Sequence, residues 1–233
     1  MPVPEAAPAP PRRRVLILYY SYSGQSSVLT RRLAAGLTEV GIEVRQERLV
    51  PVRSLRFPLG TVLKTIWLML ITAFRVRFAI QPLVVADEEP FDLVVLAGPT
   101  WSWNPSGPML SLLDQRPGLL NGRSVLALIS CRGYWRAHWR YLRRRLAQIG
   151  ARPLGPLAFD HPQSEPWRTI GVFFKVAGLA PERSSSSAVV GRFYRRFGHT
   201  PEQYQRALEL GRQLGEYLKA GQIPNDFKCL PGQ

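Results

Sequence analysis

A short apolar run that leads through a serine-rich turn into a helical pattern is the feature that most limits how this chain folds. Residues 15–20 are apolar and of strand length, and the turn at 21–27 follows them directly. From 28 to 37 the apolar residues recur with the spacing of one helix face. A wholly apolar strand joined to a helix in this way is typical of half a βαβ unit, so the pattern indicates a parallel sheet.

The same alternation of strand and helix patterns continues along the chain. Residues 42–49 alternate between apolar and polar, which predicts a strand at or near an edge of the sheet. Further strands are predicted at 91–98, 124–130 and 153–159, and helices at about 107–114, 134–149 and 201–219, the last with Thr200 and Pro201 as a favourable start. Helices are therefore expected on both faces of the sheet, with ligands bound at the carboxyl ends of its strands.

The turn after the first strand carries hydroxyl groups and no charge. It lacks the Gly-Lys-Ser/Thr ending of a Walker loop and the three glycines of the dinucleotide-binding fingerprint. Its serine hydroxyls, together with the free N–H groups of a helix N-terminus, suit a phosphate monoester. The alternative, from this turn alone, is that a serine caps an ordinary helix.

Two loops at predicted strand ends resemble the FMN-binding loops of the flavodoxin-like family. Ser-x-Ser-Gly-x-Ser at 21–26 is similar to the family's phosphate loop. Ala-Gly-Pro-Thr-Trp-Ser-Trp at 97–103 is similar to the loop in which an aromatic residue lies against the flavin ring. The resemblance covers about residues 14–149 and the last helix. It implies an α/β fold, a flavodoxin-like doubly wound five-stranded parallel sheet of order 2-1-3-4-5 with helices on both faces, and FMN as the cofactor.

The resemblance also implies three groups of cofactor-binding residues, one after each of three strands. Trp101 can stack on the flavin ring. The alternative for both Trp101 and Trp103 is that they only pack against the helix that follows them. The residues expected to hold the phosphate are Ser21, Tyr22, Ser23, Gly24, Gln25 and Ser26. One side of the flavin ring is expected to contact Pro99, Thr100, Trp101, Ser102 and Trp103. The other side is expected to contact Ser130, Cys131, Arg132 and Gly133.

The third loop departs from the family, because it carries Arg132 where flavodoxins are acidic. Reduced flavin tends to be negative near N1, so a cation there favours full reduction; alternatively Arg132 only faces solvent. The candidate catalytic residues are Arg132, Tyr134 and His161, with Tyr134, His161 or Tyr22 as proton donors. We interpret Cys131 as an inert, small apolar side chain; the alternative is covalent catalysis by its thiol, whose pKa a neighbouring arginine would lower.

Two segments are longer than a simple doubly wound fold needs. Residues 53–82 hold five basic side chains and no acidic one, around the uncharged run 65–74, which is too short for a membrane span of about 20 residues. We interpret this run as a core helix, a lid, a dimer contact or a helix lying on a membrane surface. Residues 161–198 include aromatic residues that could cover the flavin, then a flexible serine run at 184–187. We expect one domain at 14–220, with flexible tails at 1–13 and 221–233.

The formal net charge of +15 excludes the acidic surface of a typical soluble electron carrier and indicates anionic partners. An acidic acyl carrier protein or an anionic membrane surface fits this charge. Nucleic acid is not favoured, because the arginines and aromatics of 134–149 come without a nucleic-acid-reading motif. Cys131 and Cys229 are far apart and lack Cys/His neighbours, so no disulfide or metal site is expected, and a cytoplasmic location fits, including the inner face of a membrane.

A weaker resemblance refines the expected substrate. The insert at 53–82 and the third loop are similar to flavodoxin-fold proteins associated with dialkylresorcinol-condensing enzymes, which implies a cyclic or aromatic apolar substrate. We expect an FMN-dependent oxidoreductase that transfers electron pairs to or from a quinone or a polyketide- or lipid-derived ring, either a quinone reductase with NAD(P)H as donor or a flavin-dependent oxidase or aromatase. An electron-transfer flavodoxin with an acidic partner and a flavin-free scaffold or membrane-surface protein are the alternatives.

Overall fold

The computed structural model describes residues 13–53, 55–162, 167–178 and 198–222. Nearly all of the predicted N-terminal tail, the serine run at 184–187 and residues 223–233 lie outside the described residues.

Five long strands form a parallel sheet in the order expected from the sequence. They are β1 (Arg14–Tyr19), β2 (Glu43–Arg48), β3 (Leu93–Trp101), β5 (Ser124–Cys131) and β6 (Arg152–Asp160). The order is β2-β1-β3-β5-β6, and the short β4 (Asn104–Pro105) pairs antiparallel with β3 outside this path. Counting the long strands alone, this is 2-1-3-4-5, so the predicted fold class is confirmed. No residue of β2 is buried, because this strand lies at the edge of the sheet, whereas β5 is buried throughout.

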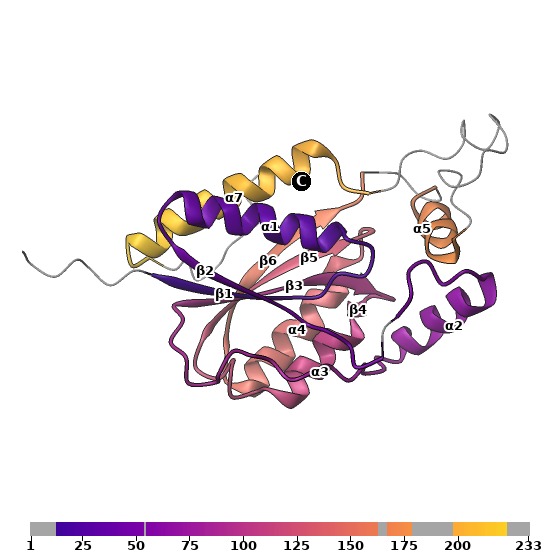
Figure 1. Cartoon of the computed structure of the whole chain (residues 1–233), viewed down its shortest axis with the longest axis horizontal. Coiled ribbons are helices and arrows are strands. Elements are labelled where there is room, and N and C mark those ends of the chain that lie inside the picture. Colours follow the sequence, from indigo (N-terminus) through magenta and orange to yellow (C-terminus); the bar gives the residue numbers. More distant parts are fainter. Residues whose placement is uncertain (1–12, 54, 163–166, 179–197, 223–233) are drawn as a thin grey trace, which may run out of the picture.

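Helices cover both faces of the sheet (Figure 1). Helices α1 (Gln25–Glu39) and α7 (Pro201–Lys219) cover one face, and α3 (Gly107–Gln115) and α4 (Trp135–Ile149) cover the other. Each face has its own apolar core, because alternate side chains of the central strands point in opposite directions. The expected start of α7 is confirmed, since Thr200 and Gln203 form a reciprocal capping box.

Helices α1 and α7 approach each other closely at glycine residues. A Cβ atom on Gly36 would collide with the backbone oxygen of Leu208, and one on Gly211 with the backbone oxygen of Leu33. The two helices therefore pack backbone against backbone, which joins an early segment of the chain to a late one.

Strand β3 runs further than the sequence pattern predicts. Residues 99–101 were expected in a loop, but parallel pairing continues to Pro99 opposite Ser130, and the strand then turns back through β4. Ser102 (φ 41°) and Trp103 (φ 68°) occupy the two turn positions, as the primed turns of two-residue hairpins require. This backbone is unfavourable for a bulky residue, and Asn104 holds it by donating from Nδ2 to the Ser102 carbonyl at 2.9 Å.

The two long insertions contribute α2 (Val62–Ala73) and α5 (Trp167–Ala177), which contact each other at one end of the molecule (Figure 1). Within the described parts of the chain, no helix has both the length and the apolar character required to cross a bilayer.

Candidate functional site

A cleft lies where the ends of β1, β3 and β5 meet the two inserted helices. It brings together side chains from all three predicted loops, and Tyr134 and His161 also line it. Three predicted residues, Ser21, Gly24 and Gly133, are not among the lining residues. The lining residues from the loops are Tyr22, Ser23, Gln25, Ser26, Pro99, Thr100, Trp101, Ser102, Trp103, Ser130, Cys131 and Arg132.

The serine-rich turn supplies one end of the cleft. Gly24 adopts a left-handed backbone (φ 88°), and nothing lies within 4 Å of the position that a Cβ would take. Ser21 accepts a hydrogen bond at Oγ from the N–H of Ser27 at 3.2 Å, so this hydroxyl orders the turn. The first N–H groups of α1 have no partners within the helix, and they end beside the hydroxyls of Ser23 and Ser26.

The two tryptophans of the β3–β4 hairpin differ in their surroundings. Trp101 is half-buried and packs edge-on against Tyr20, Tyr22 and Phe78, with ring centroids 5.5 to 5.9 Å apart. Trp103 is 52% exposed and lies edge-on to Tyr134 at 6.2 Å. Trp101 thus joins the core to the cleft wall, whereas Trp103 and Tyr134 stand at its open side.

Behind the hairpin, a buried histidine contacts a residue of the cleft wall. His138 of α4 places Nδ1 2.9 Å from Oγ1 of Thr100, and burial lowers the pKa of its imidazole to about 3. The ring is therefore neutral at ordinary pH. Sequence reasoning did not assign this contact, because the two residues lie on different elements.

The third loop does not activate its cysteine. The Cys131 thiol donates to Oδ1 of Asp160 at 2.7 Å. Burial, together with the carboxylate of Asp160, raises the thiol pKa well above its ordinary value. The alternative in which Arg132 lowers the thiol pKa is therefore wrong. The Arg132 guanidinium lies 5.6 Å from the Tyr134 ring centroid, at the cleft wall.

Two adjacent histidines connect the serine-rich turn with the third loop. His161, which follows β6, places Nε2 2.7 Å from Oε1 of Gln25 in the serine-rich turn. Its ring lies 4.8 Å from that of His199, whose Nε2 is 2.7 Å from Oγ of Ser130. His199 was not among the predicted site residues.

The protonation of His199 follows from its partners. Gln203 donates from Nε2 to the Asp160 carbonyl at 2.6 Å, which leaves its Oε1 to accept from Nδ1 of His199 at 3.1 Å. Nε2 of His199 therefore accepts the hydroxyl hydrogen of Ser130. Burial lowers the pKa of His199 to about 4, which is consistent with this neutral form.

The opposite wall of the cleft comes from the insertions, whose role the sequence left open. Helix α2 lines this wall with four side chains at helical spacing, Thr65, Leu68, Met69 and Thr72. The rest of the wall comes from Phe57 and, in α5, from Thr169, Phe173, Lys175 and Val176.

Hydrogen bonds hold this wall in place. The Tyr22 hydroxyl donates to the Arg56 carbonyl at 2.8 Å, and burial raises the pKa of Tyr22 to about 12. At the other end of α2, the Thr72 hydroxyl lies 2.9 Å from that of Ser102. The segment that leads into α2 is therefore attached to the serine-rich turn, and the last turn of α2 is attached to the hairpin.

Comparison with known proteins supports the assignment of the fold. No protein-family model matches the chain, and no curated protein matches it in sequence. Among solved structures, a protein from Bacteroides eggerthii described as a flavoprotein matches with a TM-score of 0.50 at 13% identity, covering 71% of this chain and 98% of that one. The chain has a flavodoxin-like fold.

Two further flavodoxin-like structures are similar at lower TM-scores. A flavoprotein from Lactobacillus acidophilus, solved in complex with FMN, gives 0.49 at 21% identity and covers 64% of this chain and 93% of that one. A flavodoxin from the domain Archaea gives a TM-score of 0.47 at 11% identity, and the match covers 88% of this chain and 99% of that one. In the flavodoxin-like sheet the strand order reverses between β1 and β3, where ligands bind, and the cleft lies at this point.

Proposed function

We propose that the protein is an FMN-dependent oxidoreductase that acts on an apolar ring by two-electron transfer. The observation that carries this proposal is one cleft at the strand-order switch, with an uncharged serine-rich helix N-terminus at one end and aromatic side chains at the other. The donor set on each wall fits a different part of FMN.

The phosphate would lie at the N-terminus of α1. Hydroxyls of Ser23 and Ser26 line the cleft there beside N–H groups that the helix leaves without partners. The open space at Gly24 lets an anion approach the backbone. Helix N-termini favour negative charge, so the absence of a lysine from this turn does not weaken the fit.

The flavin ring would lie between the hairpin and the third loop. Trp103 and Tyr134 offer exposed aromatic faces, Thr100 a hydroxyl positioned by His138, and Arg132 a positive charge. When bound, FMN would supply the electron-pair chemistry, while Arg132 would stabilise negative charge that develops on the ring. His161 and Tyr134, which also line the cleft, are the proposed proton donors.

The wall formed by α2 and α5 favours a substrate pocket over a bare electron carrier. Phe57, Leu68, Met69, Phe173 and Val176 give this wall an apolar surface. Apolar walls with a few placed polar groups are typical of small-molecule sites. A quinone or a polyketide- or lipid-derived ring fits this chemistry, with NAD(P)H as the proposed electron donor.

Binding of FMN and of riboflavin, which lacks the phosphate, tests the cofactor site. Ser23 is exposed, so Ser23→Glu places a carboxylate at the phosphate end without disturbing the core. We expect this variant to weaken FMN binding at least tenfold, since hydrogen bonds to charged groups contribute about 1.5–3 kcal/mol, and to leave riboflavin binding unchanged. Thr38→Glu adds the same charge at the exposed far end of α1 and is the matched control. A protein that takes up neither compound contradicts the proposal.

Turnover separates an enzyme from an electron carrier. The FMN-loaded protein is mixed with NADPH and a quinone, and NADPH oxidation is followed without any added reductase. We expect steady turnover that depends on the quinone. If the quinone is reduced only after a partner reductase is supplied, the electron-transfer alternative is correct.

A further inference from the structure

Helix α2 turns its apolar side chains toward solvent. Its buried residues are Thr65 and Thr72, both polar. Five large apolar residues point outward with the spacing i, i+3, i+4, i+7 and i+11, which places them on one side of the helix: Leu63, Ile66, Trp67, Leu70 and Phe74. We name this set the outer face of α2. A globular surface helix normally has the reverse arrangement.

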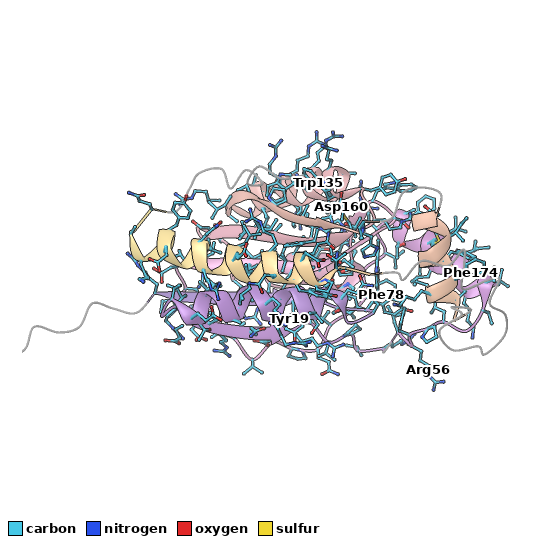
Figure 2. The ribbon with its side chains drawn as sticks, turned by 90° about the horizontal axis from the view of Figure 1, so that it is seen from above. Tyr19, Arg56, Phe78, Trp135, Asp160 and Phe174 are labelled. Atoms are coloured by element: carbon cyan, nitrogen blue, oxygen red, sulfur yellow. The ribbon has the colours of Figure 1, made fainter. Side chains whose placement is uncertain are left out.

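The exposure of the outer face is large. Leu63 is 77% exposed, Trp67 64% and Phe74 82%, and the outward Phe174 of α5 lies at the same end of the molecule (Figure 2). Isolated exposed apolar residues are common on proteins, but a contiguous set on one helix is typical of a surface that contacts a membrane or another protein.

The charged residues of α2, of α5 and of the described segments that flank α2 in the sequence are all basic up to residue 86. No acidic residue occurs between positions 53 and 86, nor in α5, while Arg53, Arg56 and Lys64 are exposed beside α2. Arg56 lies at the end of the molecule that α2 and α5 form (Figure 2). A basic border around an apolar helix complements anionic lipid headgroups, each cation contributing about 1 kcal/mol near such a surface.

We propose that the outer face of α2 docks on an anionic lipid bilayer, with α2 lying in the plane of the membrane surface. Leu63, Trp67 and Phe74 enter the boundary between headgroups and acyl chains, where tryptophan is favoured. Arg53, Arg56 and Lys64 contact the phosphates. The observations favour a bilayer over a protein partner, because the described charged residues beside the outer face are basic and the apolar residues lie on a single helix.

This docking goes beyond the proposed redox function and does not require the cofactor. None of Leu63, Trp67 and Phe74 lines the cleft, whereas Thr65, Leu68, Met69 and Thr72 of the same helix do. One helix therefore faces the lipid on one side and the cleft on the other. An apolar substrate dissolved in the membrane would be separated from the cleft by the thickness of α2.

Vesicle flotation of the purified full-length protein tests the docking. We expect the protein to float with vesicles of phosphatidylcholine and phosphatidylglycerol, and much less with phosphatidylcholine alone. The double variant Leu63→Ser/Phe74→Ser should lower the partition coefficient by at least about a hundredfold, since full burial of each apolar side chain contributes about 1.5–3 kcal/mol. Val84→Ser, at a position 84% exposed outside α2, is the matched control and should float normally.

A second pair of variants isolates the charge. Arg53→Gln/Lys64→Gln should reduce flotation about fivefold for each charge removed, and less at high salt. Arg31→Gln/Arg32→Gln removes the same charge from the exposed side of α1 and should have no effect.

Three results would overturn the docking proposal. The first is absence of flotation with either vesicle. The second is flotation that Val84→Ser reduces as much as Leu63→Ser/Phe74→Ser does. The third is an unaltered protein that does not float and that sedimentation velocity shows to be a dimer, while Leu63→Ser/Phe74→Ser is a monomer. The outer face is then a contact between two copies. Circular dichroism of each variant confirms that it is folded, and FMN content is recorded separately because it reports on the cleft alone.

Discussion

The Oγ1 atom of Thr100, in the wall of the cleft, lies 2.9 Å from Nδ1 of the wholly buried His138. The contact joins the end of β3 to α4 and fixes the direction of a hydroxyl that lines the cleft. His138 is thus a positioning residue, because it acts on the site through Thr100.

Replacing His138 by phenylalanine should destabilise the protein and alter the cleft. The Thr100 hydroxyl loses its hydrogen-bond partner, which costs about 0.5–1.5 kcal/mol of unfolding free energy, and urea denaturation measures the loss. His138→Asn keeps an acceptor close to the position of Nδ1 and should recover part of it. If the phenylalanine variant denatures at the same urea concentration as the unaltered protein, the contact does not contribute to stability.

The two neutral buried histidines predict how stability changes with pH. The pKa is lowered to about 3 for His138 and about 4 for His199, so between these values and about 6.5 the unfolded chain binds protons that the folded chain does not. Stability should therefore be full above pH 7 and fall as the pH drops below about 6.5, by about 1.4 kcal/mol per histidine at one pH unit below that value. Urea midpoints across this range measure the slope, and His138→Phe should reduce it by about half.

The Cys131 thiol should react slowly with iodoacetamide at neutral pH. Burial and Asp160 both raise its pKa, so little thiolate is present. The measurement is made in a Cys229→Ser background, and the rate should be at least about tenfold below that of a free thiol. Asp160→Asn removes the neighbouring negative charge and should increase the rate. Rapid alkylation of Cys131 in the unaltered protein would contradict the raised pKa.

Arg132 should raise the midpoint potential of bound flavin. Its guanidinium lies at the cleft wall, and loss of a charge interaction of about 1–2 kcal/mol corresponds to about 20–40 mV for a two-electron couple. We expect Arg132→Ala to lower the potential by this amount in spectroelectrochemical titration. Arg136→Ala, on the exposed side of α4 and outside the cleft lining, should leave it unchanged. An equal potential in both variants shows that Arg132 does not contact the ring.

Gly36→Ala should destabilise the protein although alanine is the better helix former. The new Cβ collides with the Leu208 carbonyl of α7, and overpacking of this kind costs about 1–3 kcal/mol. Thermal unfolding measures the effect, and Ala35→Ser, on the exposed side of α1, is the control. A more stable Gly36→Ala protein would mean that the two helices can move apart without loss.

Sequence patterns predict the parts of this structure that depend on neighbours along the chain. The serine-rich turn before α1 and the capping box at Thr200 are local, and both lie where the pattern puts them. The contacts of His138 with Thr100 and of His199 with Ser130 join residues far apart in sequence, and no local pattern contains them.

Local sequence patterns also do not determine the orientation of α2 or the length of β3. Helical spacing shows that α2 has distinct sides, but it does not show which side faces inward. In the structure the side with the polar Thr65 and Thr72 faces inward. Proline at position 99 reads as the end of a strand, yet pairing with Ser130 carries β3 past it.

The glycine contact between α1 and α7 has a consequence for the order of events during synthesis. The ribosome completes β1, the serine-rich turn and α1 early, but the surface that α1 needs for packing is made only after residue 201. Until then, the side of α1 that packs against α7 has no cover. Early chains would therefore expose this glycine-containing side of α1 to solvent until nearly the whole protein has been made.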